Sequence, residues 1–408
     1  MSYFAFLRAN LRWLAAGFML MFASSFGQTF FISIFAGEIR ATFGLSHGAW
    51  GGIYTIGTLA SAGLMFLSGG LADRIPPKRL TLMVLILFIC AALAMAANPV
   101  AMLLPVIIFA LRYCGQGMMS HMAIVNVGRW FAARRGQAVS VTSLGFSVGE
   151  AFLPIIFVLI MGVIGWRGGW VVAALILVGL WPVLAVLLRA DRQPVGTTGA
   201  EADQTGMDGR HWSRHDALSH WLFWICLPAL MAPPAFGTAF FFQQVHLTEV
   251  KDWPLEGFVA LFPIYTGSGV ASMFLFGWIV DRFGSSRILP FFLAPLCLGL
   301  VLAARADTLL SVLPAFLFLG MMHGMNTALF GAFWPDVYGT KHLGSVRAVA
   351  SSLGVFASAI GPGITGLMID RGIGFETQLL MMAGYCLIVS LPLFTAMMRL
   401  RRHLVRAA

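Results

Sequence analysis

Two charged residues stand out because each lies deep inside a long apolar stretch of the sequence. Arg112 is about eleven residues into the stretch 101–127, or roughly 16 Å along a helix, and Glu150 is about thirteen residues into 137–164, or roughly 20 Å. A charge surrounded by hydrocarbon costs several kcal/mol unless it is paired or wetted, so both are functional candidates. We expect Arg112 to attract an anion and Glu150 to carry a proton.

These two residues predict a shared cavity near the middle of a membrane. Consecutive spanning helices run in opposite directions, so both side chains fall at a similar depth, and we expect them to pair during part of a transport cycle. A static pair that only fixes helix packing is the alternative. Uncharged residues in other apolar stretches are candidates to line the same cavity: Gln28, Tyr54, His121, Asn126, Gln243, Gln244, Tyr265, His323, Asn326 and Trp334. For each histidine alone, the favoured alternative is a hydrogen bond between helices, and the aromatic residues can serve ordinary packing.

The composition places these residues in a membrane protein. The chain has 408 residues, of which 59% are hydrophobic and 10% charged, and the mean hydropathy is +0.86. Soluble domains have about 25% charged residues and 45–50% apolar residues. Twelve runs approach the roughly 20 apolar residues that a spanning helix needs: 11–35, 50–70, 80–97, 101–127, 137–164, 169–188, 220–242, 255–280, 288–304, 309–333, 345–369 and 378–398. Their apolar residues are continuous rather than alternating, which favours helices over barrel strands.

Charge predicts the orientation of the chain. Most of the 26 Lys and Arg residues fall in the loops on the side that both termini share. This bias predicts that both termini are cytoplasmic. It also accounts for the formal net charge of +10 without a nucleic-acid partner.

The chain divides into two similar halves. We expect a six-helix bundle at 1–188, a flexible cytoplasmic linker at 189–219 and a second six-helix bundle at 220–408. Gly69-Gly70-Leu71-Ala72-Asp73-Arg74 follows the second run, and a similar Gly277 to Arg282 segment follows the eighth, which indicates duplication. His211 and His215 in the linker lack a third ligand, so no metal site is predicted. No cofactor is expected, and the five cysteines are interpreted as small buried hydrophobic residues.

The repeated segments resemble the loop signature of the major facilitator superfamily, usually written Gly-x-Leu-Ala-Asp-Arg-x-Gly-Arg-Arg. The resemblance covers the whole chain, although Pro76 replaces the second glycine in the first copy. It implies an all-α integral membrane fold of twelve helices in two pseudo-symmetric bundles. It also implies a conformational latch made of Gly69, Asp73, Arg74, Gly277, Asp281 and Arg282. The alternative is that these basic residues serve membrane topology alone.

Two further signatures of the family occur in modified form. Arg112-Tyr113-Cys114-Gly115-Gln116-Gly117 resembles Arg-x-x-Gln-Gly of span four but is one residue longer. In span five, Gly145-x-x-x-Gly149 is followed by Glu150, where the antiporter motif has proline, which disfavours a drug antiporter. Segments before spans five and eleven resemble bacterial monocarboxylate-porter-like and oxalate/formate-exchanger-like members, namely 128–136 and 334–339. The basic residue that these members carry in span eight is missing here, and span one holds Gln28 but no carboxylate.

The resemblance implies a secondary transporter that works by alternating access in the bacterial inner membrane as a monomer. We expect a small organic anion of the monocarboxylate type as substrate, with proton coupling. The alternative is a proton-driven exporter of drugs or amphipathic metabolites. An intramembrane enzyme is disfavoured because HExxH, GxSxG and paired aspartates are missing, and a missing Walker loop disfavours ATP as the energy source. A sensor without transport activity would need a folded signalling domain, for which the linker is too short and polar.

Overall fold

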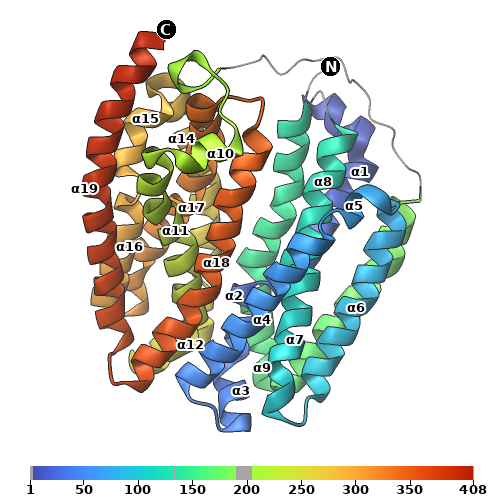
Figure 1. The fold of residues 1–408 in the computed structure, drawn as a ribbon. Helices are drawn as coiled ribbons and strands as arrows, with labels where there is room; N and C mark the ends of the chain where they lie inside the picture. The colour runs from blue at the N-terminus through green and yellow to red at the C-terminus, as the bar shows by residue number, and fades with distance from the viewer. Residues whose placement is uncertain (1–2, 132–133, 190–204, 408) are drawn as a thin grey trace. The chain divides into compact units, whose positions relative to one another are not determined.

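A computed structural model describes residues 3–131, 134–189 and 205–407. Within these ranges, the side chains of Tyr3, Phe4, Asp73, Arg135 and residues 401–407 are outside the description. The chain forms two compact units, residues 1–199 and 200–408, each described by itself below. All regular structure in the described residues is helical, and Figure 1 shows that the long helices of each unit lie side by side.

The first unit begins with a broken span. Helix α1 (Tyr3–Ser24) leads into the short 3₁₀ helix η1 (Ser25–Gly27), and α2 (Thr29–Ile32) follows after a bend of 47°. The other elements of this unit are η2 (Ser33–Phe35), α3 (Ala36–Phe43), α4 (His47–Ser68), α5 (Leu71–Arg74), α6 (Pro77–Ala97), η3 (Ala101–Leu103), α7 (Leu104–Arg112), the π-helix η4 (Tyr113–Met119), α8 (Ser120–Trp130) and α9 (Arg135–Leu187).

Helix α9 holds two spans that are joined without a loop. It has 53 residues, and Gly165 interrupts it with φ 71° and ψ 169°. This backbone conformation is essentially restricted to glycine. The parts before and after Gly165 are each long enough to cross a bilayer.

The second unit consists of the elements after residue 204. They are η6 (Met207–Gly209), α10 (Arg214–Ser219), α11 (Trp221–Phe242), α12 (Gln244–Val250), α13 (Leu255–Val259), α14 (Phe262–Phe283), α15 (Ser285–Ile288), η7 (Leu289–Phe291), α16 (Ala294–Arg305), α17 (Leu309–Tyr338), α18 (Leu343–Asp370) and α19 (Phe375–Ala407). Within this unit, α14 packs along α17, α11 along α18, and α16 between α17 and α19.

The span count agrees with the sequence once two breaks are taken into account. In the described residues, ten helical segments are long and apolar enough to cross a membrane, and the bent pair in the first span makes eleven. The segment Gly136–Leu187 counts once among these, although Gly165 divides it in two. The predicted all-α membrane fold is confirmed, and the segments correspond to the twelve predicted runs.

Glycines bring helices close together in each unit. A Cβ atom on Gly145 of α9 would lie 2.9 Å from the carbonyl carbon of Phe18 in α1, and one on Gly149 would lie 2.7 Å from Cβ of Ser25. In the second unit, a Cβ atom on Gly324 of α17 would lie 2.6 Å from the backbone nitrogen of Met273 in α14. Contacts this close need glycine, as in the small-residue interfaces of other membrane helices.

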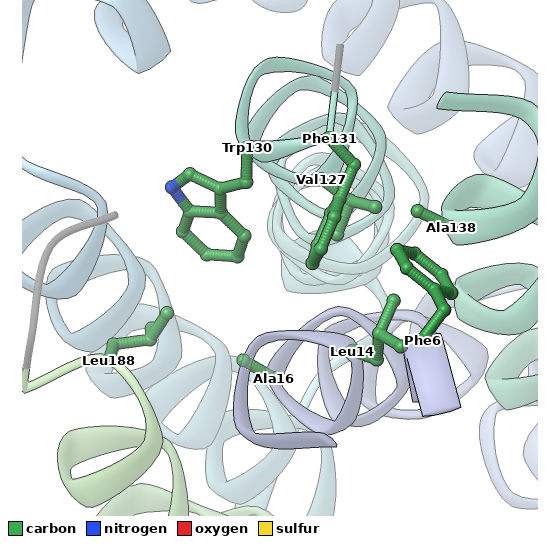
Figure 2. Packing of buried hydrophobic residues seen from close by; sticks show 8 residues of the cluster. All are labelled: Phe6, Leu14, Ala16, Val127, Trp130, Phe131, Ala138 and Leu188. Atoms are coloured by element: carbon green, nitrogen blue, oxygen red, sulfur yellow. The ribbon is translucent and has the colours of Figure 1, made fainter. Parts of the chain in front are cut away.

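An apolar cluster holds together the end of the first unit that carries the N-terminus. Figure 2 shows its eight buried residues, which are Phe6, Leu14, Ala16, Val127, Trp130, Phe131, Ala138 and Leu188. The rings of Phe6 and Phe131 meet edge to face at 5.5 Å. Arg12 of α1 donates hydrogen bonds to the carbonyls of Val186 (2.7 Å) and Leu187 (2.9 Å), so it caps the last turn of α9.

The structure differs from the predicted flexible linker over residues 205–219, which are folded within the second unit. The backbone N–H of Trp212 donates to the carbonyl of Tyr338 at 3.0 Å, its indole packs on Tyr338 and His220, and Arg210 stacks on it at 4.0 Å. Polar composition favoured a loop, but one buried tryptophan anchors the segment. The predicted linker residues 190–204 lie outside the described residues.

The cysteine interpretation holds for four of the five thiols. Cys114, Cys226, Cys297 and Cys386 are buried, and Cys90 on α6 is exposed. Exposure of a small apolar residue on a spanning helix is compatible with contact to lipid, because lipid tails are themselves apolar.

Candidate substrate and coupling site

Arg112 is buried at the end of α7, where three elements of the first unit meet. Its side chain is 1% exposed, and Nη1 donates a hydrogen bond of 3.0 Å to the carbonyl of Gly27. The guanidinium carbon lies 5.3 Å from the centre of the Tyr54 ring, which α4 supplies. The Tyr54 hydroxyl shares a hydrogen bond of 2.6 Å with the hydroxyl of Thr29 in α2. Among the described residues, Nε of Arg112 has no hydrogen-bond partner.

The break in the first span explains why a carbonyl is available to Arg112. Gln28 has extended backbone angles (φ −87°, ψ 158°), so regular helical hydrogen bonding stops there. A helix end leaves carbonyl groups without partners, and the Gly27 carbonyl receives Arg112 instead. Gly27 also has no space for a side chain, because a Cβ atom would lie 2.8 Å from Cα of Gly115.

The π-helix η4 accounts for the extra residue in the span-four signature. It begins at Tyr113, directly after Arg112, and contains Gly115, Gln116 and Gly117. A π-helical turn bonds residue i to i+5 and therefore holds one more residue than an α-helical turn. The insertion is absorbed within η4, so the helix beyond it does not rotate by the roughly 100° that one extra α-helical residue would cause.

Glu150 follows a residue of α9 that packs against the same break. Its side chain is 6% exposed, and the preceding Gly149 packs against Ser25 of η1. Ser25 and Gly27 belong to the same three-residue segment, so Arg112 of α7 bonds to η1, and α9 approaches η1 at Gly149, the residue before Glu150. The pairing of Glu150 with Arg112 during transport stays a prediction.

The uncharged candidates of the first unit lie at different places. Gln28 is half-buried at the break itself. Asn126 on α8 is 2% exposed, and its Nδ2 has no hydrogen-bond partner among the described residues. The imidazole Nε2 of His121 lies 3.1 Å from the carbonyl of Gly69, which connects His121 with the loop after α4. Gly27 and Thr29 are site residues that we did not predict. The available signal was the group of polar residues Ser24, Ser25, Gln28 and Thr29 inside an apolar span.

The two copies of the predicted latch have different local structures. In the first copy, α4 ends before Gly69, and the short helix α5 contains Asp73 and Arg74. The Arg74 side chain is exposed, and the Asp73 side chain is outside the description. In the second copy, Gly277, Asp281 and Arg282 all remain in α14, which ends at Gly284 with φ 84°. Consecutive Gly69 and Gly70 have poor helix propensity, which agrees with the early end of α4.

The candidates of the second unit form a separate group. Tyr265 of α14 is 7% exposed, and its ring lies 6.2 Å from that of His323 in α17. Both line a cavity of about 50 Å³ together with Phe240, Phe241 and Met322. Asn326 has an Oδ1 atom without a partner in the described residues, and Gln243 donates to the hydroxyl of Thr365 at 3.1 Å.

Trp334 packs within the second unit. Its ring contacts Phe223, Phe330, Phe333 and Tyr338, and the side chain is 4% exposed. Of the two interpretations given for this residue, the contacts favour ordinary packing. Groups of three or more His, Cys, Asp or Glu residues that could hold a metal ion do not occur in the described part of the chain.

Spanning helices in two units, with buried polar residues between them in each unit, define a polytopic integral membrane protein. The family model described as Major Facilitator Superfamily matches residues 17–362. The chain therefore belongs to the Major Facilitator Superfamily, and it is a membrane transporter rather than an enzyme.

Solved structures have the same fold at low sequence identity. A bacterial homolog of the human lysosomal transporter Spinster, in an inward-facing and unoccupied conformation, is 15% identical with a TM-score of 0.69, over 97% of this chain and 95% of that one. The nucleoside transporter NupG is 13% identical with a TM-score of 0.73, over 96% of this chain and 99% of that one. These similarities show the fold alone.

One curated relative matches over a short region. The probable plastidic glucose transporter 1 of Arabidopsis thaliana is 30% identical over 109 residues, which is 26% of this chain and 20% of that protein. The matched region is about a fifth of the length of the relative. The predicted membership of the superfamily is confirmed, and the finer resemblance to monocarboxylate and oxalate/formate carriers stays a prediction.

Proposed function

We propose that the protein is a secondary active transporter of a small organic anion of the monocarboxylate type, coupled to protons and working by alternating access. It acts as a monomer in the bacterial inner membrane with both termini in the cytoplasm. The observation that carries the proposal is the buried guanidinium of Arg112, which contacts one carbonyl and one aromatic ring and whose buried Nε has no hydrogen-bond partner in the described part of the chain.

The environment of Arg112 suits an incoming carboxylate. Two of the described contacts of the guanidinium are with groups that carry no formal charge, the Gly27 carbonyl and the Tyr54 ring. A guanidinium presents five N–H donors in a planar fork, so a carboxylate can bind it through two parallel hydrogen bonds. Such a bond would neutralise the buried charge, whose burial is costly without a partner. One cationic residue matches a substrate with a single carboxylate.

Glu150 is the proposed proton carrier. It is a buried carboxyl group on a spanning helix, next to the segment whose Gly27 carbonyl holds Arg112. A carboxyl group that takes up a proton from one side and releases it to the other would couple transport to the proton gradient.

Uptake into proteoliposomes tests both roles. Radiolabelled lactate, formate and oxalate are offered with and without an inward proton gradient, to the unmodified protein, Arg112→Gln, Arg112→Lys and Glu150→Gln. We expect one of the monocarboxylates to accumulate, Arg112→Gln to abolish uptake and Arg112→Lys to reduce it, because lysine cannot form the bidentate contact. Glu150→Gln should retain exchange of substrate but lose accumulation driven by the gradient. Uptake that survives in Arg112→Gln would refute the anion site.

A second candidate function is export of amphipathic compounds, and one cavity favours it. An apolar cavity of about 280 Å³ lies between α11, α18 and α19, and its lining includes Phe236, Ile360 and Tyr385. This volume exceeds the roughly 150 Å³ of an engineered cavity that binds benzene. An exporter would extrude a lipophilic dye in the same proteoliposomes, and that activity would survive Arg112→Gln.

A further inference from the structure

We propose that His121, together with Tyr113 and Arg129, positions the loop after α4 by holding its backbone, so that span four connects the anion site with this loop. The inference rests on the proposed function for the site at one end of this connection, but the contacts themselves are independent of substrate. It changes the role of His121, which the sequence placed among the residues of the substrate pathway.

Three side chains of span four reach three positions at and just after the end of α4, namely Ser68, Gly69 and Ala72. The Tyr113 hydroxyl donates to Oγ of Ser68 at 2.8 Å, His121 Nε2 lies 3.1 Å from the Gly69 carbonyl, and Arg129 Nη1 donates to the Ala72 carbonyl at 2.9 Å. A carbonyl accepts only, so Nε2 of His121 is the donor. We call these three residues the clasp.

The clasp binds backbone carbonyl groups that the helix itself does not pair. Helix α4 ends at Ser68 and α5 has only four residues, so carbonyls of this segment lack regular helical partners. The Gly69 carbonyl has one long bond, of 3.4 Å, from the N–H of Ala72. His121 and Arg129 donate hydrogen bonds to these carbonyls. Because both side chains bind the main chain, they fix the path of the loop independently of the loop's own side chains.

The clasp is linked to the anion site through the helix that carries both. Tyr113 is the residue after Arg112 and the first residue of the π-helix η4, and His121 and Arg129 follow on α8. A displacement of Arg112 on substrate binding moves the start of η4, and through Tyr113 it acts directly on Ser68. His121 is therefore a positioning residue that transmits the state of the site to the loop.

Hydrogen exchange of the full-length protein in nanodiscs, followed by mass spectrometry, tests the clasp without any substrate. We expect His121→Ala to accelerate exchange of the amides in residues 69–75 about 3- to 10-fold, which corresponds to the loss of one hydrogen bond. His121→Gln, which keeps a donor, should restore most of the protection, and Tyr113→Phe should accelerate exchange near Ser68. Ser120→Ala is the matched control, because the Ser120 hydroxyl bonds within its own helix at 3.4 Å from the Gly115 carbonyl.

Kinetics of lactate uptake distinguish a positioning role of His121 from direct contact between His121 and the substrate. His121→Ala should lower the maximal rate several-fold and leave KM unchanged, with rescue by His121→Gln. Unchanged exchange in residues 69–75 would overturn the proposal, and so would a raised KM at an unchanged maximal rate, which would return His121 to the substrate pathway. If Arg112→Gln leaves uptake intact while His121→Ala still accelerates exchange, the proposed function fails and the clasp stands.

Discussion

Arg112 caps the broken end of the first span by donating from Nη1 to the carbonyl of Gly27, 85 positions away in the sequence. This contact places a permanent cation beside the one point of α1 and α2 where helical hydrogen bonding stops. The guanidinium pairs the carbonyl that the break leaves free, and the carbonyl uses one of the five N–H donors of the guanidinium. A carboxylate would bind to the remaining donors. The candidate site is therefore formed by a discontinuity in the backbone as much as by side chains.

The close contact between Gly27 and Gly115 predicts that Gly27→Ala is destabilising. The added Cβ atom would lie 2.8 Å from Cα of Gly115, and overpacking of this kind costs about 1–3 kcal/mol. We expect a lower midpoint of thermal unfolding in detergent and a strong loss of uptake. Gly63→Ala in α4 is the control, since nothing lies within 4 Å of its added Cβ atom. Equal stability of both variants would contradict the close approach.

The ring of Tyr54 predicts different effects for two substitutions. Tyr54→Phe keeps the aromatic face 5.3 Å from the Arg112 guanidinium and removes the hydroxyl, which bonds to Thr29. Tyr54→Leu removes the ring, and a desolvated cation–π contact contributes about 2 kcal/mol. We expect KM for lactate to rise roughly 30-fold in Tyr54→Leu and at most a few-fold in Tyr54→Phe, measured in proteoliposomes. The reverse order would mean that the hydroxyl, rather than the ring, orients the site.

The π-helix predicts that span four tolerates the loss of one residue. Deletion of Gln116 from η4 should convert this segment to regular α-helix and leave Arg112 and His121 on their present faces. Expression and thermal stability should stay near those of the unmodified protein. Deletion of Ile124 in the regular helix α8 is the comparison, because it rotates the following residues by about 100° and should prevent folding. Failure of both deletions to fold would argue against this role of η4.

Asp216, in the folded segment before α11, predicts a local dependence on pH. Its carboxylate accepts hydrogen bonds from the Ser213 hydroxyl at 2.6 Å and the Ser213 N–H at 3.0 Å, and these bonds lower the pKa of Asp216. Because the pKa is lowered on folding, the stabilisation is complete above the ordinary aspartate pKa and is lost as pH falls through the lowered value. Carbon-13 NMR of Asp-labelled protein should show this carboxyl titrating at higher pH in Ser213→Ala. An unchanged titration would contradict the cap.

The spans and the fold class follow from the sequence because hydrocarbon leaves a spanning chain few alternatives to helix. The breaks within spans do not follow in the same way. Gln28 interrupts a helix inside an apolar run, and hydropathy averages over it. Gly165 lies between the predicted runs 137–164 and 169–188, but hydropathy does not reveal that a single residue makes the turn. The extra residue after Arg112 was visible in the sequence, but its accommodation as a π-helix depends on hydrogen bonding that spacing alone does not reveal.

The charged residues of the site could be predicted from the sequence, but the contacts of the surrounding polar residues could not. Arg112 and Glu150 stood out because ions are rare inside apolar runs, and both are buried near η1. His121 was assigned to the substrate pathway because a polar residue on a spanning helix has several possible partners. Its contact with the Gly69 carbonyl depends on where α4 ends, which the pair Gly69 and Gly70 determines locally.

The hairpin at Gly165 has a practical consequence for experiments on orientation. Its two spans are joined through a single residue with φ 71°, so an inserted epitope tag would have to rebuild the turn. Tags or single cysteines for membrane-sidedness assays are better placed at exposed positions between elements, such as Lys341 between α17 and α18. Antibody access to such a tag, from intact and from permeabilised cells, would establish which face of the membrane each connecting segment occupies.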